Sequence, residues 1–179
     1  MIVFRAPGEV PAGFGPSVVV IGKFDGVHSG HRAVIDRARV TATDADARVV
    51  AVTFDRNPLS LLRPELCPDP LSSVEQKLEL LAEAGVDATL VLRFDAELAG
   101  LEPRAFVEHV LVDALGVVTV MVGDDFRFGR GGAGDQVPPD PRRAAAPRRR
   151  RGGGARGAAA ARRPDRTRAA EPHRTDARV

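Results

Sequence analysis

Residues 17–31 read SVVVIGKFDGVHSGH, and this stretch decides how the rest of the chain is interpreted. Its first five residues form a largely β-branched run that ends at Gly22, as expected of a buried strand. A glycine-rich loop follows, and over residues 31–41 apolar side chains recur at helical spacing. The stretch therefore predicts a strand, a loop and a helix in direct succession.

The same alternation continues toward the C-terminus. Strand-like apolar runs occupy residues 49–54, 88–92 and 117–122, and helical patterns occupy residues 73–84 and 103–115. Ser72 and Glu75 have the spacing of a capping box at the start of the first of these helices, and a glycine ends each helix. Four apolar strands separated by helices predict an α/β fold with a Rossmann-like parallel sheet covered on both faces. Such sheets bind ligands at the carboxyl ends of their strands.

Charge divides the chain into two regions. Residues 136–179 hold 13 Arg against four acidic residues, so this tail carries +9 while residues 1–135 carry −7. The tail consists mainly of Arg, Ala, Pro and Gly, which cannot form a core, and we expect it to be disordered. Its abrupt start is typical of translation in a shifted reading frame. We therefore expect one domain at residues 1–135, followed by a disordered tail at residues 136–179.

Composition also excludes several protein classes. The single cysteine, Cys67, excludes a disulfide framework and suits a reducing cytoplasm. Nothing at the N-terminus resembles a signal peptide, and the longest β-like apolar run, residues 117–122, is far shorter than the ~20 residues that a membrane helix needs. The arginines of the tail would bind phosphate backbones nonspecifically, but the tail lacks aromatic residues for stacking bases. We expect a soluble cytoplasmic protein with no membrane contact and no specific nucleic-acid partner; the oligomeric state stays open.

The loop after the first apolar run carries the strongest chemical signal. His28-Ser-Gly-His31 falls where a strand gives way to a helix, and a helix N-terminus offers free N–H groups and a positive dipole to an anion. Gly26 allows a tight turn, and Gly30 lets a phosphate approach the backbone. Two imidazoles there can donate hydrogen bonds to oxygens that gain charge during phosphoryl transfer. The alternatives are a chance surface pair or a metal site, for which residues 1–135 offer only one further histidine, His109.

A second glycine motif carries less weight. Residues 129–134 read GRGGAG and satisfy the G-x-G-x-x-G pattern of dinucleotide-binding proteins. They do not directly follow a strand, and three prolines between residues 138 and 141 oppose a helix after them. We interpret them as a mobile glycine loop.

Four motifs in the same order resemble the bacterial FAD synthetase family, the adenylyltransferase module of bifunctional riboflavin kinase/FMN adenylyltransferases. They are GKFDGVHSGHR at 22–32, TFDRNP at 53–58, RFDAELA at 93–99 and VGDDFRFG at 122–129. The resemblance implies a sheet of the HIGH nucleotidyltransferase type. It also implies transfer of AMP from ATP to FMN, with Mg²⁺, giving FAD and pyrophosphate.

The resemblance further implies roles for individual residues. The catalytic positions are His28, His31 and Asn57; the nucleotide-binding positions are Gly22, Phe24, Asp25, Gly30, Gly123 and Asp125; the flavin-binding positions are Phe54, Pro58, Leu98, Phe106 and Phe128. Asp125 is expected near the phosphates and the magnesium ion, and no set of protein metal ligands is predicted. Phe54 and Phe106 fit core packing equally well, because both lie on the apolar faces of their elements.

The chain departs from the family pattern at several points. Asn57 stands where the family usually has histidine, and an amide can donate a hydrogen bond but cannot carry a proton. Nothing after Asp135 matches the family's RxSSTxxR motif, which grips the phosphates from the other side, or the riboflavin kinase module. We therefore expect an incomplete domain that binds FMN or ATP weakly and makes FAD slowly or not at all. The alternatives are a flavin- or nucleotide-binding remnant without turnover, another nucleotidyltransferase of the superfamily, and nonspecific nucleic-acid binding through the tail.

Overall fold

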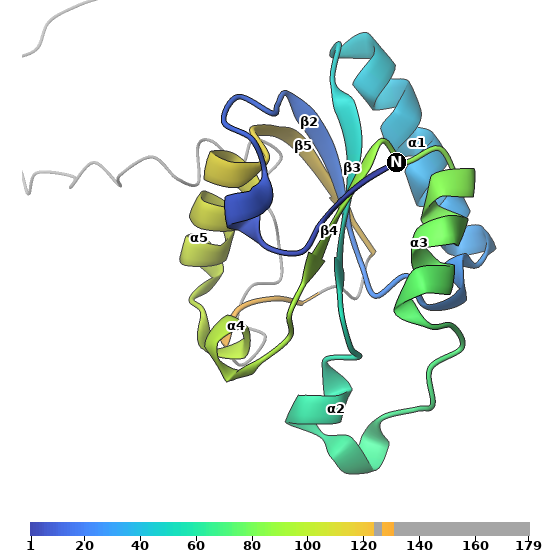
Figure 1. Cartoon of the computed structure of the whole chain (residues 1–179), viewed down its shortest axis with the longest axis vertical. Coiled ribbons are helices and arrows are strands. Elements are labelled where there is room, and N and C mark those ends of the chain that lie inside the picture. The colour runs from blue at the N-terminus through green and yellow to red at the C-terminus, as the bar shows by residue number, and fades with distance from the viewer. Residues whose placement is uncertain (124–126, 131–179) are drawn as a thin grey trace, which may run out of the picture. The chain divides into compact units, whose positions relative to one another are not determined.

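A computed structural model describes residues 1–123 and 127–130. Five parallel strands form one sheet in the order β1-β4-β3-β2-β5 (Figure 1). The strands are β1 (Ile2–Phe4), β2 (Ser17–Ile21), β3 (Arg48–Phe54), β4 (Ala88–Leu92) and β5 (Val117–Val122). The predicted α/β fold with a parallel sheet is confirmed. Asp125, the tail at residues 136–179 and most of the glycine loop lie outside the described residues, so the predicted domain boundary stays a prediction.

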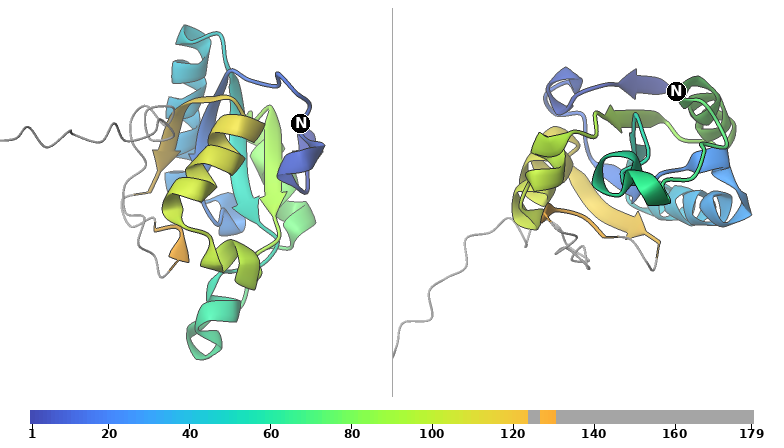
Figure 2. Two further views of the ribbon diagram at one scale, coloured as in Figure 1. Left: turned by 90° about the vertical axis from the view of Figure 1, so that its left-hand side faces the viewer. Right: turned by 90° about the horizontal axis from the view of Figure 1, so that it is seen from below.

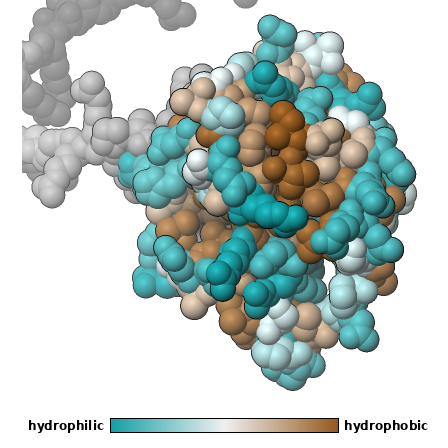
Figure 3. All heavy atoms as spheres, in the orientation of Figure 1, coloured by the Kyte–Doolittle hydropathy of each residue, from teal (hydrophilic) through white to brown (hydrophobic). Residues whose placement is uncertain are grey.

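The central strands match their sequence patterns because they are buried on both faces. Every residue of β2 and β4 is buried, and so is every residue of β3 after Arg48. Such strands appear as continuous apolar runs. Strand β1 was not predicted, because it has only three residues and two of them, Ile2 and Val3, are exposed. A dark apolar stripe lies over this strand in the space-filling view (Figure 3).

Helices cover both faces of the sheet (Figure 2). The long ones are α1 (Ser29–Asp44) and α3 (Val74–Glu83) on one face, and α5 (Pro103–Phe106) continued by the π-helical η4 (Val107–Ala114) on the other. The short ones are η1 (Pro7–Glu9), η2 (Asp25–Val27), α2 (Leu59–Leu62), η3 (Pro64–Leu66) and α4 (Ala96–Gly100). The predicted helices at 31–41, 73–84 and 103–115 are thus confirmed, although the last is wound as a π-helix over its second half.

The start of α3 differs by one residue from the prediction. Ser73, rather than Ser72, accepts a hydrogen bond from the backbone N–H of Gln76, and the Gln76 side chain accepts one from the Ser73 backbone N–H. The predicted partner Glu75 lies in the first turn but is not part of the box. The Ser72 hydroxyl has other partners, in the loop after β2.

Gly15 and Gly116 allow the two backbone segments just before β2 and β5 to approach each other closely. Gly116, with φ of 56°, follows η4, and a Cβ on Gly15 would lie 2.8 Å from the Gly116 Cα and carbonyl oxygen. Only glycine fits at position 15 without a shift of the backbone.

Within residues 1–123 and 127–130, no helix is long and apolar enough to cross a membrane.

Candidate functional site

The carboxyl ends of all five strands lie at one edge of the sheet, because the strands are parallel. From β2 the chain moves to β3 and β4 on one side, and it later returns to the other side of β2 as β5. This reversal creates the position where open α/β sheets bind ligands. The loops after β2 and β3 carry most of the predicted catalytic and phosphate-binding residues.

The loop after β2 is anchored to the neighbouring strand. The Gly22 N–H donates to the Val52 carbonyl at 3.1 Å, and the Thr53 hydroxyl donates to the Lys23 carbonyl at 3.1 Å. Phe24 is only 2% exposed and adopts a left-handed backbone with φ of 51°. Such a conformation is uncommon for an aromatic residue and persists only where the surroundings enforce it. The buried Phe24 side chain therefore fixes the conformation of the loop after β2 by packing into the core.

His28 and His31 lie together at the N-terminus of α1. Their rings stack with centroids 3.7 Å apart and an interplanar angle of 24°, and the Phe24 ring packs edge-on against His31 at 5.1 Å. A Cβ on Gly30 would come within 3.2 Å of the His28 ring, so a larger residue there would press on this imidazole. His28 takes the position before the helix without capping it through its side chain. Both imidazoles therefore lie close to the first backbone amides of α1.

His31 is neutral at physiological pH. Burial is the largest cause that lowers the pKa of His31, and together with the charges of His28 and Lys23, and against the opposing charge of Asp25, it brings this pKa from 6.5 to about 4. Its Nδ1 is buried and has no hydrogen-bond partner in the described part of the chain. A neutral imidazole offers one N–H donor and one acceptor. His31 therefore has unused hydrogen-bonding capacity at the place where the sequence predicts phosphate.

Asp25 ties the loop after β2 to the start of α3. Its carboxylate accepts from the Leu71 N–H at 3.0 Å, and from the Ser72 N–H at 3.1 Å and hydroxyl at 3.2 Å. The Ser72 hydroxyl in turn accepts from the Gly26 N–H at 3.1 Å. Burial raises the pKa of Asp25, but these hydrogen bonds and the charge of Lys77 outweigh it and lower the pKa below its usual value. The structure thus assigns Asp25 a role in holding two loops together.

The loop after β3 is held by its own polar residues. Asp55 accepts from the Phe94 N–H at 2.9 Å and donates its own N–H to the Leu92 carbonyl at 3.0 Å, which joins the loop to the end of β4. Asn57 accepts from the Leu59 N–H at 3.1 Å through its side-chain oxygen and so starts α2, with Pro58 between them. The oxygen of Asn57 is therefore engaged locally. Leu61 and Leu62 in α2 are exposed, and so are Leu66 and Leu71 beyond it.

Four of the five predicted flavin residues lie on the opposite face of the sheet from the histidines, and the fifth, Pro58, precedes α2 in the loop after β3. Phe54, Phe106 and Phe128 are buried in one apolar cluster, against which Leu98 packs. The rings of Phe106 and Phe128 lie 5.7 Å apart, and that of Phe54 lies 5.4 Å from Phe94. These aromatic side chains serve as core in the structure, and their contact with flavin stays a prediction. Gly123 is exposed after β5.

Sequence reasoning missed Lys77. This side chain is only 7% exposed, and its ammonium donates to the Phe54 carbonyl at 3.1 Å. A signal was present, because Lys77 falls on the apolar face of α3 between Val74 and Leu81, where a charged residue needs a partner.

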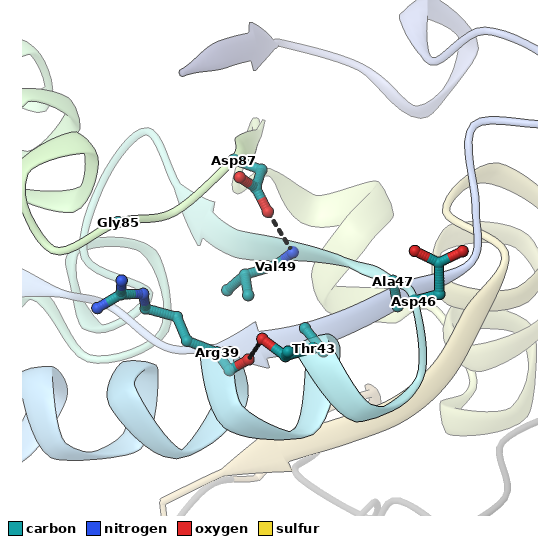
Figure 4. A pocket seen from close by; sticks show the side chains of 8 residues that line it. Arg39, Thr43, Asp46, Ala47, Val49, Gly85 and Asp87 are labelled. Carbon is teal, nitrogen blue, oxygen red and sulfur yellow. Dashed lines mark hydrogen bonds between the residues drawn. The ribbon is translucent and has the colours of Figure 1, made fainter.

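A separate hollow of ≈ 520 Å³ lies at the opposite edge of the sheet, before β3 and β4 (Figure 4). Its polar contacts are internal to the fold: Asp87 accepts from the Val49 N–H at 2.8 Å and the Thr43 hydroxyl donates to the Arg39 carbonyl at 3.0 Å. None of the predicted site residues lines it.

Five parallel strands with a histidine pair at the helix that follows β2 define an α/β fold of the nucleotidyltransferase type. The sequence profile of the FAD synthetase family matches residues 12–138. The chain belongs to the FAD synthetase family.

Relatives and a solved structure are similar over the same region. The bifunctional riboflavin kinase/FMN adenylyltransferase of Escherichia coli K12 is 42% identical over 118 residues, which are 66% of this chain and 38% of the relative. Its counterpart from Listeria monocytogenes is 40% identical over 120 residues, 65% of this chain and 37% of that protein. The chain therefore spans less than two fifths of the length of these relatives. A crystal structure described as a macrolide-efflux protein from Streptococcus pneumoniae superposes with a TM-score of 0.60 and 25% identity, covering 72% of this chain and 42% of that one.

Proposed function

We propose that residues 1–135 form an FMN adenylyltransferase domain, which transfers AMP from ATP to the phosphate of FMN. In this reaction an oxygen of the FMN phosphate attacks the α-phosphorus of ATP in line. The bond from that phosphorus to the oxygen bridging toward the β-phosphate breaks, and pyrophosphate leaves. Family membership and the similarity to named FMN adenylyltransferases support the proposal.

One observation carries the proposal: the stacked His28–His31 pair at the N-terminus of α1, with a buried nitrogen on His31 that has no partner within residues 1–123 and 127–130. Phosphoryl transfer depends mainly on positioning and on donors aimed at oxygens that gain charge. The first amides of α1 and the two imidazoles supply such donors. Gly22, Phe24 and Gly30 shape the loop that presents them, and Asp25 fixes that loop.

The flavin is proposed to bind beside the loop after β3, next to Phe54 and Pro58, with Leu98, Phe106, Phe128 and the nucleotide-side residue Gly123 nearby. Mg²⁺ would neutralise phosphate charge during the transfer. Across residues 1–123 and 127–130, no cluster of three or more His, Cys, Asp or Glu could hold a metal ion. Asp125, which the family resemblance places near the magnesium, lies outside the described residues. A cytoplasmic location and the absence of specific nucleic-acid binding are parts of the same proposal.

Binding of flavin or nucleotide without turnover is the second candidate. Asn57 favours it, since its amide cannot carry the proton of the histidine usual in the family and its oxygen is engaged with Leu59. A slow transferase forms FAD from FMN and ATP, whereas a remnant that only binds these substrates forms none.

Incubation with FMN, ATP and Mg²⁺ tests the proposal, with FAD separated by chromatography. We expect FAD at a low rate, and none when riboflavin replaces FMN. The matched control is His31→Ala, which should bind FMN but form FAD at least ~10²-fold more slowly. Binding of both substrates with no FAD would support the second candidate, and binding of neither would refute both.

A further inference from the structure

Lys77 is the one buried lysine among the described residues, and it lies beneath the candidate site. Its side chain rises from the first turns of α3, and its ammonium donates to the carbonyl of Phe54, the last residue of β3, at 3.1 Å. The loop that contains Asn57 and Pro58 starts directly after this carbonyl. Lys77 therefore holds the point at which the loop after β3 leaves the sheet.

The same end of α3 is connected to the loop after β2. Asp25 binds the backbone of Leu71 and Ser72, and the next residue, Ser73, caps α3. The carboxylates of Asp25 and Asp55 both act on the Lys77 ammonium. Burial lowers the pKa of Lys77, and these two charges oppose that effect. The charge of one cation is thus stabilised by an acidic residue from each of the two loops.

Stability alone gives little reason for a lysine at this position. An ammonium with 7% exposure has lost most of its water. Replacing a whole buried ion pair by apolar residues is often neutral or stabilising, so a buried charge is weak evidence for a role in stability. The position is instead suited to anion chemistry, because two phosphate-bearing molecules must approach loops that carry Asp25 and Asp55. A nearby cation offsets the repulsion between those carboxylates and the phosphates.

We propose that Lys77 is a positioning residue for the phosphate-bearing substrates: it fixes the loop after β3 relative to the loop after β2 and offsets the charges of Asp25 and Asp55. The proposal rests on the proposed function for its substrates. Lys77 acts through the loops and touches no reacting atom.

The test compares Lys77→Met with Lys77→Arg and with Arg37→Met. The first keeps the apolar stem and removes the charge, the second keeps the charge, and the third removes a positive charge from an exposed position on α1. Inorganic tripolyphosphate serves as the anion probe in calorimetry. We expect Lys77→Met to stay folded but to unfold at a lower urea concentration, because the Phe54 carbonyl loses its donor. It should bind tripolyphosphate on the order of tenfold more weakly. Lys77→Arg should recover part of this loss, and Arg37→Met should bind like wild type.

Two further readouts separate positioning from a purely structural role. In Lys77→Met the carboxyl pKa of Asp25, followed by ¹³C NMR, should rise because a nearby positive charge is lost. The kcat for FAD formation should fall by ~10²-fold, as expected when a reacting group is misplaced. If Lys77→Met does not fold, Lys77→Gln, which keeps a donor for the Phe54 carbonyl, supplies the same comparison.

The outcomes distinguish this inference from the proposed function. A wild-type chain that makes no FAD would refute the transferase, while tripolyphosphate affinity and the Asp25 pKa would still decide the role of Lys77. Wild-type affinity together with an unchanged Asp25 pKa in the folded charge-removing variant would overturn the proposal.

Discussion

Acidification should destabilise the fold between pH 6.5 and about pH 4 through His31. The ring of this residue lies between Phe24 and His28, and its Nδ1 is buried without a partner in the described residues. Its pKa is lowered from 6.5 to about 4, chiefly by burial. Because the folded state binds the proton less readily than the unfolded chain, the unfolded chain gains protons first as the pH falls. Stability is therefore highest above pH 6.5 and declines toward pH 4.

The size of the effect follows from the two pKa values. With 6.5 unfolded and about 4 folded, the free energy of unfolding falls by ~1.8 kcal/mol between about pH 7 and about pH 5. His31 is only partly buried, so solvent screening reduces the expected loss to ~1 kcal/mol. Removing the imidazole should remove this part of the pH dependence.

Urea unfolding followed by far-UV circular dichroism at the two pH values measures this loss. The chain has no Trp or Tyr, so circular dichroism is the suitable signal. We expect His31→Asn to lose ~1 kcal/mol less than wild type on acidification. The matched control is His109→Asn, since His109 is exposed on η4 and should retain the wild-type dependence. Equal losses in wild type and His31→Asn would refute the argument that burial keeps His31 neutral.

Three further predictions concern substitutions of His28, Asp25 and Gly15. His28→Ala should slow FAD formation by ~10²-fold with an unchanged circular dichroism spectrum, because its ring lies at a helix start outside the core; unfolding at room temperature would show that the ring is structural. Asp25→Asn should lower the free energy of unfolding at neutral pH by ~1 kcal/mol, because charge-assisted hydrogen bonds are lost. This difference from wild type should shrink as the pH falls through the lowered pKa of the Asp25 carboxyl. Gly15→Ala should cost ~1–3 kcal/mol in urea unfolding because its Cβ would meet the Gly116 backbone at 2.8 Å, whereas Gly8→Ala, with nothing within 4 Å, should be nearly neutral.

The fold could be predicted where local pattern and burial agree. The sequence predicts strands β2 and β4 at their observed bounds, because continuous apolar runs report burial on both faces. Strand β5 is predicted at its observed bounds as well, although only Val117 in it is fully buried. The cap of α3 was placed one residue early. Ser72 has a good local pattern, but its hydroxyl is used by Gly26 and Asp25, some 46 residues earlier in the chain. Local spacing cannot detect such a contact.

In the candidate site, too, local patterns could be predicted and contacts between distant parts of the chain could not. The histidine pair was identified from spacing, since both residues belong to one loop and one helix turn. Lys77 was missed, since its partner, the Phe54 carbonyl, comes from a strand 23 residues away. The aromatic side chains show the opposite ambiguity, because a buried Phe106 looks alike in sequence whether it packs in the core or faces a flavin.

The most direct test of the account is the fate of the α-phosphorus of ATP. The chain is mixed with FMN, Mg²⁺ and ATP labelled with ³²P at the α-position, and the products are separated. The account predicts that the label appears in FAD, and that it disappears from FAD when His28 and His31 are both replaced by alanine. Label that stays in ATP, or that moves to AMP without FAD, would contradict the central claim that this chain transfers an adenylyl group to FMN.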